Sequence, residues 1–275
     1  MINQKISKNK LDKRSKYLRS LICKILLSTD RGHFGSAMSL VEILRVLYDE
    51  IIFFDSIKPQ NDKRDRVILS KGHGCLALYA ILADKGFFPM KELEKAFSKN
   101  ALLGGHPENH IPGVEVSTGA LGHGFSLAVG MAKAAKIKKK NHKIYVIVGD
   151  GELNEGANWE AALSASQNKL GNLKVIVDCN KIQSHSFTKD IINVEPLAKK
   201  FDTFGFDVSK VDGHNILQLK KNFYKFSKSK KDKPSITICN TVKGKGFKFA
   251  ENNPLWHHRN FFLQEDIKKI NESLK

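Results

Sequence analysis

The sequence predicts an α/β protein with a mostly parallel sheet that is covered by helices on both faces. The first indication is a pair of short apolar runs, 144–148 and 175–177, because continuous β-branched runs are typical of strands buried on both sides. The second is the segment between them, 154–170, which is helix-like and rich in alanine. A strand, a helix and a strand in this order form a unit of a parallel sheet.

Helices dominate the chain before these runs. Apolar residues recur at helical spacing over 11–26, which predicts a first helix ending near Ser28. Ser39 and Glu42 form a capping-box pattern, so a second helix is expected to begin at Ser39. The other elements expected here are a strand over 67–69 and helices over 74–84, 90–97 and 125–135.

Strands and helices continue to alternate after the second apolar run. The expected elements are a helix over 196–204, a strand over 206–211, a helix over 215–226, a strand over 235–239 and a terminal helix over 264–274. No internal repeat and no Gly/Ser-rich or Pro-rich linker interrupts this order. We therefore expect residues 1–275 to form a single domain.

The charge balance is strongly basic, with 46 Lys plus Arg against 28 Asp plus Glu and a net charge of +18. The basic residues gather over 5–16, 133–143 and 220–233. This balance makes nucleic acid an alternative partner. No helix-turn-helix, zinc-finger or RNA-recognition pattern accompanies the clusters, and lysine, which greatly outnumbers arginine, is poorly suited to bidentate recognition. We therefore interpret the clusters as solvated surface and expect no nucleic-acid partner.

Cysteine usage and hydropathy indicate the compartment. The cysteines are expected to be reduced and mostly buried, because they are widely spaced, at positions 23, 75, 179 and 239. No apolar stretch is long enough to span a bilayer. The first apolar stretch is broken by Arg19 and Lys24, unlike a signal peptide. These features predict a cytoplasmic protein without a membrane partner.

Polar residues stand at the end of each apolar run that opened the fold prediction. Asp150, between two glycines, follows the first run, and Asn180 closely follows the second. Ligands of open α/β sheets bind at the carboxyl ends of the strands. A carboxylate and an amide oxygen at that edge suit a hard cation such as Mg²⁺, and Gly151 allows the backbone to approach a phosphate closely. The pattern therefore predicts a metal and phosphate site.

Histidines recur beside glycine in predicted loops. Gly32-His33, Gly72-His73-Gly74, Gly105-His106 and Gly122-His123-Gly124 show this pattern, and a further pair stands at His257-His258. Backbone freedom beside an imidazole is typical of loops that face a ligand. Several imidazoles in one site suit a substrate with hydroxyl and carbonyl groups. No Ser-His-Asp, Cys-His or zinc-binding spacing is present.

Around these residues the sequence resembles the thiamine-diphosphate motif of transketolases. The resemblance is carried by Gly149-Asp150-Gly151-Glu152-Leu153-Asn154-Glu155-Gly156, by Trp159-Glu160-Ala161 and by Asp178-Cys179-Asn180-Lys181-Ile182-Gln183, and the loops match in order over roughly residues 10–265. It implies a thiamine-diphosphate-binding fold. It also implies that Asp150, Asn180 and the carbonyl of Ile182 hold the metal, and that Gly151 and Asn180 touch the diphosphate. The implied cofactors are thiamine diphosphate and Mg²⁺, with Ca²⁺ or Mn²⁺ able to substitute.

The resemblance also assigns roles to the histidine loops. His33 is implied to contact the sugar, and His106 to face the terminal hydroxyls of the donor. His257 is implied to lie between the sugar and the diphosphate, and His73 to contact thiamine diphosphate. The first three of these are assigned as catalytic.

Two further groups of residues receive roles from the same resemblance. The loop residues Gly119, Ala120 and Leu121 are implied to line the thiazolium pocket. Glu155 and Glu160 are implied to be catalytic carboxylates at a subunit interface, linked to the proton network of the cofactor. The sequence departs from the family at several loop positions, including Ala120 in place of proline, His123 in place of glutamine and His258 in place of glycine. These departures leave the acceptor sugar open.

The resemblance covers only the diphosphate-binding half of a full-length transketolase. We therefore expect no pyrimidine-binding or C-terminal domain within 1–275. The expected partner is a C-terminal transketolase subunit that carries the pyrimidine-binding domain, in an α2β2 heterotetramer. The expected reaction is transfer of a two-carbon ketol unit from a ketose to an aldose, with sugars or sugar phosphates as substrates.

Three alternatives remain open from the sequence. The α subunit of a 2-oxo acid dehydrogenase would share the metal motif but would not need the sugar-facing histidines. A transketolase-like subunit for an unusual sugar fits the same motifs. Outside the enzymes, the alternative is a basic nucleic-acid-binding protein with an incidental Gly-Asp-Gly turn.

Overall fold

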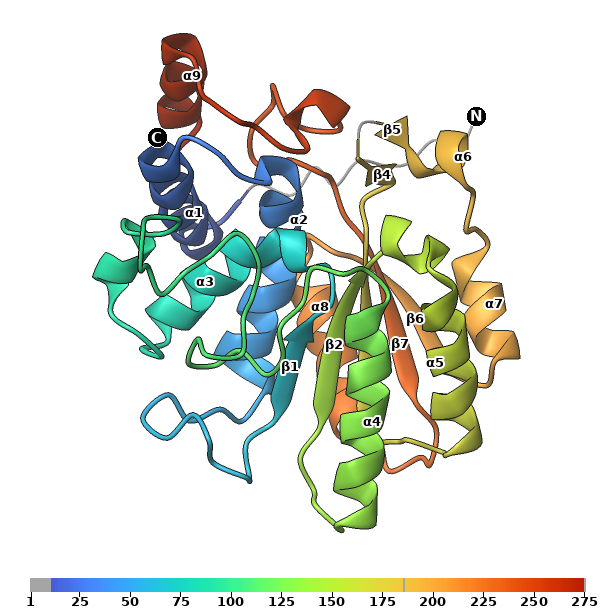
Figure 1. The fold of residues 1–275 in the computed structure, drawn as a ribbon. Coiled ribbons are helices and arrows are strands. Elements are labelled where there is room, and N and C mark those ends of the chain that lie inside the picture. The colour runs from blue at the N-terminus through green and yellow to red at the C-terminus, as the bar shows by residue number, and fades with distance from the viewer. Residues whose placement is uncertain (1–10, 185, 275) are drawn as a thin grey trace.

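The computed structural model describes residues 11–184 and 186–274, and the centre of this part of the chain is a five-stranded sheet (Figure 1). All its neighbouring strands are parallel. The order across the sheet is β1 (Arg66–Leu69), β2 (Ile144–Gly149), β3 (Leu173–Cys179), β7 (Ser235–Asn240) and β6 (Asp207–Asp212). A small antiparallel pair, β4 (Ile182–Gln183) and β5 (Ser186–Phe187), lies beyond the carboxyl end of β3.

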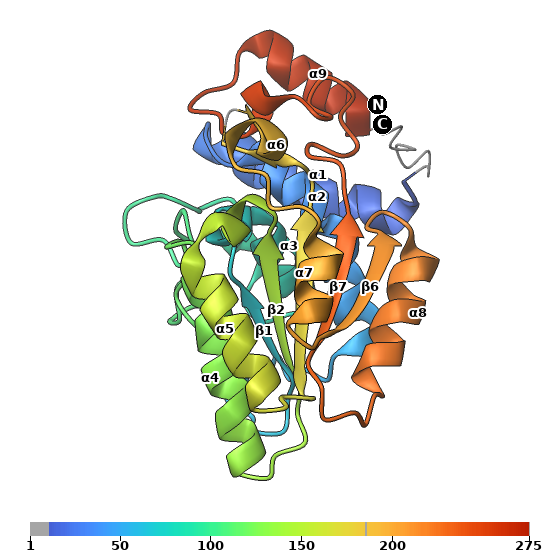
Figure 2. The same ribbon diagram turned by 90° about the vertical axis from the view of Figure 1, so that its right-hand side faces the viewer.

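Helices cover both faces of the sheet, which confirms the predicted α/β class (Figures 1 and 2). One layer consists of α4 (His123–Ile137), α5 (Gly156–Gln167) and α7 (Leu197–Thr203). The opposite layer consists of α1 (Lys13–Thr29), α2 (Phe34–Val46), α3 (Cys75–Asp84) and α8 (Ile216–Ser227). The short α6 (Thr188–Ile191) follows the small hairpin, and α9 (Gln264–Leu274) packs beside α1. Residues 1–10, which include part of the first basic cluster, lie outside the described residues.

Alternation along the strands divides the core into two parts. In β2, Tyr145 and Ile147 belong to the core on the α2 side, whereas Val146 and Val148 belong to the core on the α4 side. Both sides are buried, so each strand needs apolar residues at every position. This is why the run 144–148 is continuously apolar in the sequence. Alanines on α4 and α5 keep side-chain bulk small where these helices pack together.

The predicted capping box at Ser39 is wrong. α2 begins at Phe34, with His33 as its N-cap, so Ser39 lies inside the helix. The Ser39 hydroxyl donates instead to Asp178 Oδ2 at 2.7 Å, a contact with a residue at the carboxyl end of β3. The other member of the pattern, Glu42, is fully buried among long-range partners. A local pattern was therefore overruled by two tertiary contacts.

Two helix boundaries also differ from the prediction. The segment 90–97 forms only a short 3₁₀ helix, Met90–Leu93, followed by turns. The segment 154–170 divides into a 3₁₀ helix, Gly151–Asn154, and α5, which ends at Gln167. Among the described residues, no helix is long and apolar enough to cross a membrane. The cysteines at 23, 75, 179 and 239 are buried and free, as predicted.

A buried polar network joins the N-terminal helices to the loops at the carboxyl ends of the strands. Glu42 accepts hydrogen bonds from Arg19 Nη1 at 2.6 Å and Nη2 at 3.0 Å, and its Oε2 lies 2.8 Å from His214 Nδ1. The other ring nitrogen of His214 accepts a hydrogen bond from the backbone N–H of Val242 at 2.8 Å. Burial acts to raise the pKa of Glu42, but Arg19 and His214 outweigh it and hold that pKa well below its ordinary range.

We expect Glu42→Gln to destabilise the protein strongly, because it leaves the buried guanidinium of Arg19 without its counter-charge. The loss should be about 3–5 kcal/mol in the free energy of unfolding. Urea unfolding of the purified chain measures it. A matched control is Glu265→Gln, which removes an exposed carboxylate paired with Lys269 on α9 and should cost about 1 kcal/mol or less. Equal losses in the two variants would contradict the role given to the network.

Candidate active site

The predicted metal ligands lie at the carboxyl ends of two neighbouring strands. Asp150 follows β2 and Asn180 follows β3, and these parallel strands are directly paired. The Asp150 carboxylate accepts a hydrogen bond from the backbone N–H of Lys181 at 2.6 Å, and Asn180 Oδ1 accepts one from the backbone N–H of Ile182 at 3.1 Å. The turn after β3 is therefore folded back onto Asp150. These contacts bring together a carboxylate, an amide oxygen and the backbone of Ile182.

The chemistry of these donors fits the predicted metal. Carboxylate, amide and carbonyl oxygens are hard ligands, and Mg²⁺ takes few of them from the protein. Among the described residues, no group of three or more His, Cys, Asp or Glu side chains could hold a metal ion. That result is expected of a set with a single carboxylate. Burial and the neighbouring Asp178 raise the pKa of Asp150 to about 6, so a cation at its oxygens would relieve the cost of its charge.

A lysine that the sequence reasoning did not select lies at the same place. Lys243 Nζ donates to the carbonyl of Ile182 at 3.0 Å and lies 2.5 Å from His257 Nδ1. A carbonyl oxygen has two lone pairs, so this contact leaves it able to bind a cation. Burial and the nearby Lys71 lower the pKa of Lys243 to about 7, which reduces the positive charge that a metal would meet there.

A second buried carboxylate holds the ends of several elements together. Asp178 lies 2.5 Å from Lys71 Nζ and accepts hydrogen bonds from Ser39 and Thr241. It also accepts one from the side-chain amide of Asn180 at 3.3 Å. Burial acts to raise the pKa of Asp178, but Lys71 and the hydroxyl donors lower it below its ordinary value. The charged form is thus stabilised, and it orients the amide of Asn180.

The histidines of four separate segments meet in one cluster beside these carboxylates. His33 lies at its centre, with ring centroids 5.3 Å from His73, 6.3 Å from His106, 5.3 Å from His257 and 4.5 Å from His258. His73 and His257 are 5.7 Å apart. The cluster therefore contains all the histidines that were assigned roles in the sequence, together with His258, which was noted only as a departure from the family.

The cluster is held in the neutral state. Burial, then the neighbouring His258, His106 and lysines, lower the pKa of His33 to about 3. Burial and Lys71 likewise lower the pKa of His73 well below its ordinary value. Neutral imidazoles can donate and accept hydrogen bonds with hydroxyl and carbonyl groups at neutral pH.

This shift has a measurable consequence for stability. A histidine with a folded-state pKa of about 3 binds its proton mainly in the unfolded state between that pH and about 6.5. Stability should therefore rise with pH through this window and be fully present above it. His33→Asn should flatten the rise, as measured by the unfolding midpoint in urea at a series of pH values. An unchanged pH profile in the variant would contradict a neutral His33.

The remaining predicted residues lie on two neighbouring segments. Gly119 adopts φ +144°, and a Cβ there would come within 2.8 Å of the His106 ring, so the loop 119–121 packs directly against the histidine cluster. Glu155 and Glu160 are exposed at the start of α5, away from the histidine rings. His123 is exposed at the first turn of α4 and makes no ring contact with the described members of the cluster.

Gly151 is required for a reason other than the one predicted. A Cβ at this position would come within 2.5 Å of Gln183 Cβ, so β4 packs directly on the Gly-Asp-Gly turn. The neighbouring Glu152 is buried and accepts hydrogen bonds from the Ser70 hydroxyl at 2.5 Å and from the Gly122 N–H at 3.0 Å. These contacts tie the ends of β1 and β2 to the loop before α4.

Several residues with a place in the site were not selected from the sequence. The lysines stand beside motif residues, in Lys71-Gly72-His73 and Val242-Lys243-Gly244, but lysine is too common for that position to be informative. Ser36 Oγ, in the first turn of α2, is buried and has no hydrogen-bond partner among the described residues. An anionic oxygen would satisfy this hydroxyl, so the residues present fit a diphosphate as well as a metal.

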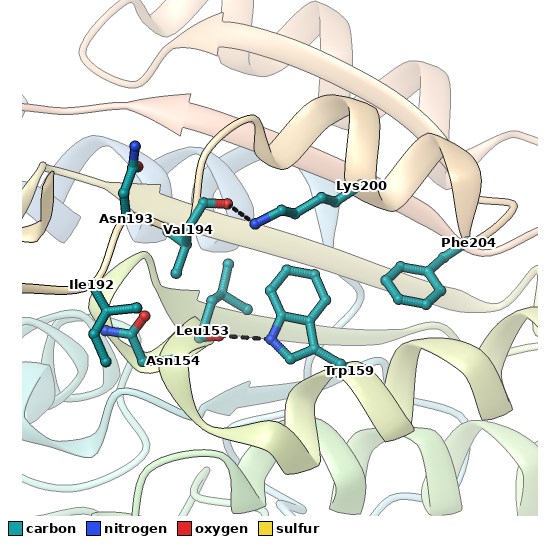
Figure 3. A pocket seen from close by; sticks show the side chains of 8 residues that line it. All are labelled: Leu153, Asn154, Trp159, Ile192, Asn193, Val194, Lys200 and Phe204. Atoms are coloured by element: carbon teal, nitrogen blue, oxygen red, sulfur yellow. Dashed lines mark hydrogen bonds between the residues drawn. The ribbon is translucent and has the colours of Figure 1, made fainter.

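A separate pocket of about 410 Å³ lies beside α5 and is shown in Figure 3. Trp159 forms its floor and donates from Nε1 to the carbonyl of Leu153 at 2.9 Å. Lys200 donates to the carbonyl of Val194 at 2.8 Å and lies over the Trp159 ring. The described residues that line this pocket include no histidine and no carboxylate. The chemistry therefore belongs to the histidine cluster.

The parallel sheet and the order of its loops define a thiamine-diphosphate-binding domain of the α/β class. The family model "Transketolase, thiamine diphosphate binding domain" matches residues 11–274. The chain belongs to the transketolase family. Its fold is accordingly that of the solved transketolases: the structure from Campylobacter jejuni superposes with a TM-score of 0.88 at 32% identity, over 95% of this chain.

Shorter relatives match nearly end to end. One of the named subunits of an apulose-4-phosphate transketolase, from Actinobacillus succinogenes, is 43% identical over 256 residues, which cover 92% of each chain. The "6-deoxy-6-sulfo-D-fructose transketolase subunit SqwG" of a Clostridium species is 38% identical over 260 residues, which cover 94% of each. In contrast, this chain covers only 42% of the Campylobacter jejuni transketolase.

Proposed function

We propose that this chain is the diphosphate-binding subunit of a split transketolase that transfers a two-carbon ketol unit from a ketose to an aldose. The observation that carries the proposal is the meeting of His33, His73, His106 and His257 in one cluster, beside Asp150 and the turn after β3. Sugars need many hydrogen-bonding groups, and a cofactor diphosphate needs a metal with oxygen ligands. Both are present at one edge of the sheet.

Each part of the site has a proposed task. Asp150, Asn180 and the carbonyl of Ile182 would hold Mg²⁺, which would bind the diphosphate. When bound, thiamine diphosphate supplies the nucleophilic carbon and the electron sink of the reaction. His33 and His257 would move protons at the hydroxyl and carbonyl oxygens of the sugar, since their neutral rings can donate and accept.

Membership in the transketolase family favours this function over two of the alternatives. The α subunit of a 2-oxo acid dehydrogenase has no use for a sugar-facing histidine cluster. A nucleic-acid-binding protein has no use for the buried carboxylates at the ends of β2 and β3. The relatives named for apulose 4-phosphate and for 6-deoxy-6-sulfo-D-fructose support the proposal that the substrate of this chain is a sugar outside the common ketose phosphates.

The histidine variants test the proposal directly. His257→Ala and His33→Ala should each lower kcat/KM for the sugar by roughly 10²-fold or more, with a smaller effect on cofactor affinity. The assay is ketol transfer by the enzyme assembled with its partner subunit, Mg²⁺ and thiamine diphosphate. His142→Ala is a matched control, because His142 precedes β2 at the opposite end of the sheet. Wild-type turnover in both cluster variants would overturn the sugar-binding role.

A further inference from the structure

A pocket of about 450 Å³ opens from the histidine cluster toward the loop that follows α3. His33, His106 and His258 line one part of it. The lining also includes Arg31 and, from two other segments, Asn100 and Asn260. The pocket therefore combines neutral imidazoles with a cation and two amides. Its volume is in the range of sites for small ligands.

A short backbone pairing fixes the positions of these groups. Gly32 and Arg259 form an isolated antiparallel bridge, with N–H to carbonyl distances of 2.9 Å in both directions. In this register His33 is opposite His258, and Arg31 is opposite Asn260. The cation is therefore one step along the same bridge from the imidazoles, and it is on the side of the bridge away from α2.

The guanidinium of Arg31 is exposed and is held in place by an aromatic ring. Its Cζ lies 5.5 Å from the ring centroid of Phe97, within the range of a cation–π contact. Among the described residues, no carboxylate forms an ion pair with Arg31. Phe97 itself has φ +64°, a left-handed conformation that is strained for a bulky residue. Such strain concentrates where a loop has to present a side chain to a ligand.

We propose that Arg31 is a specificity-determining residue that binds the phosphate monoester of a sugar substrate, with its reacting end among the histidines. A guanidinium forms paired hydrogen bonds to a phosphate, and stacking on Phe97 leaves its N–H groups free for them. The amides of Asn100 and Asn260 supply further donors at the same part of the pocket. This inference rests on the proposed function, because it assigns the substrate class of the same site.

The test separates charge recognition from catalysis. Arg31→Met keeps most of the side-chain length and removes the charge, whereas Arg31→Lys keeps the charge. In the assembled enzyme, Arg31→Met should raise KM for ribose 5-phosphate by about 10–100-fold and change kcat/KM for ribose less than about threefold, with partial recovery in Arg31→Lys. Lys221→Met is a matched control, because it removes an exposed cation on α8. An equal loss with both sugars, or no loss with either, would overturn the proposal.

A second measurement needs neither the partner subunit nor ketol transfer. Phosphorus NMR titration of the purified chain with ribose 5-phosphate should show binding that is weakened about tenfold or more in Arg31→Met and unchanged in Lys221→Met. Binding that does not depend on Arg31 would overturn the inference even if the enzyme is a transketolase. Conversely, Arg31-dependent binding by a chain that never supports ketol transfer would overturn the proposed function and leave the anion site standing.

Discussion

Asp150→Ala is expected to abolish Mg²⁺-dependent binding of thiamine diphosphate to the assembled enzyme. The variant removes the only carboxylate from a donor set whose other members are an amide and a backbone carbonyl. It also removes the acceptor of the Lys181 N–H, which holds the turn after β3 against β2. Asn180→Ala should have a comparable effect. We expect affinity to fall by at least about 100-fold in each, since even indirect perturbation of a metal site costs 10–100-fold.

Titration calorimetry with and without Mg²⁺ measures this effect. Asp207→Ala is a suitable control, because Asp207 begins β6 at the opposite end of the sheet and pairs with the exposed Lys231. Chelation of the metal from the wild-type enzyme should reproduce the defect of Asp150→Ala, and the variant should no longer respond to added Mg²⁺. Unchanged cofactor affinity in both site variants would rule out the metal assignment.

The second large effect concerns the partner. We expect the purified chain to show no ketol transfer by itself, even with Mg²⁺ and thiamine diphosphate in excess, because the aminopyrimidine-binding half of the site belongs to a second subunit. Leu127 on α4 and Leu163 on α5 are 44% and 56% exposed, on the helices that cover the loops of the site. Glu155 and Glu160 are exposed beside them. This surface would be covered in an α2β2 assembly.

Reconstitution tests the partner prediction. Activity should appear when the cognate C-terminal subunit is added, and sedimentation should then show a heterotetramer. Leu163→Asp should weaken assembly by placing a charge in the interface, and Leu217→Asp, at a still more exposed position on α8, should not. Full activity of the chain without any added subunit would sink the split-enzyme proposal.

Most of the fold could be predicted because its signals are local. The run 144–148 had to be apolar at every position, since its two faces meet two different cores. The positions of Asp150 and Asn180 followed from the strands, because parallel neighbours end at a common edge. The metal and sugar roles of these residues remain predictions.

The capping box at Ser39 shows where local reasoning fails. Ser39 and Glu42 have the spacing of a helix start, and the sequence offers no sign that their partners are Asp178 and Arg19. A hydroxyl and a carboxylate satisfied by distant residues no longer need to cap a helix. Only contacts across the fold revealed that α2 begins five residues earlier, at Phe34.

The sequence by itself determined the class of fold, the edge of the sheet at which the site lies and the family, because these depend on periodicity and on short motifs. The tertiary structure decided which residues complete the site. Lys71 reaches Asp178 across 107 positions of sequence, and Lys243 reaches Ile182 across 61. His258 joins the histidine cluster whereas His123 does not. Pairings of this kind are fixed by packing between distant elements, which no local pattern encodes.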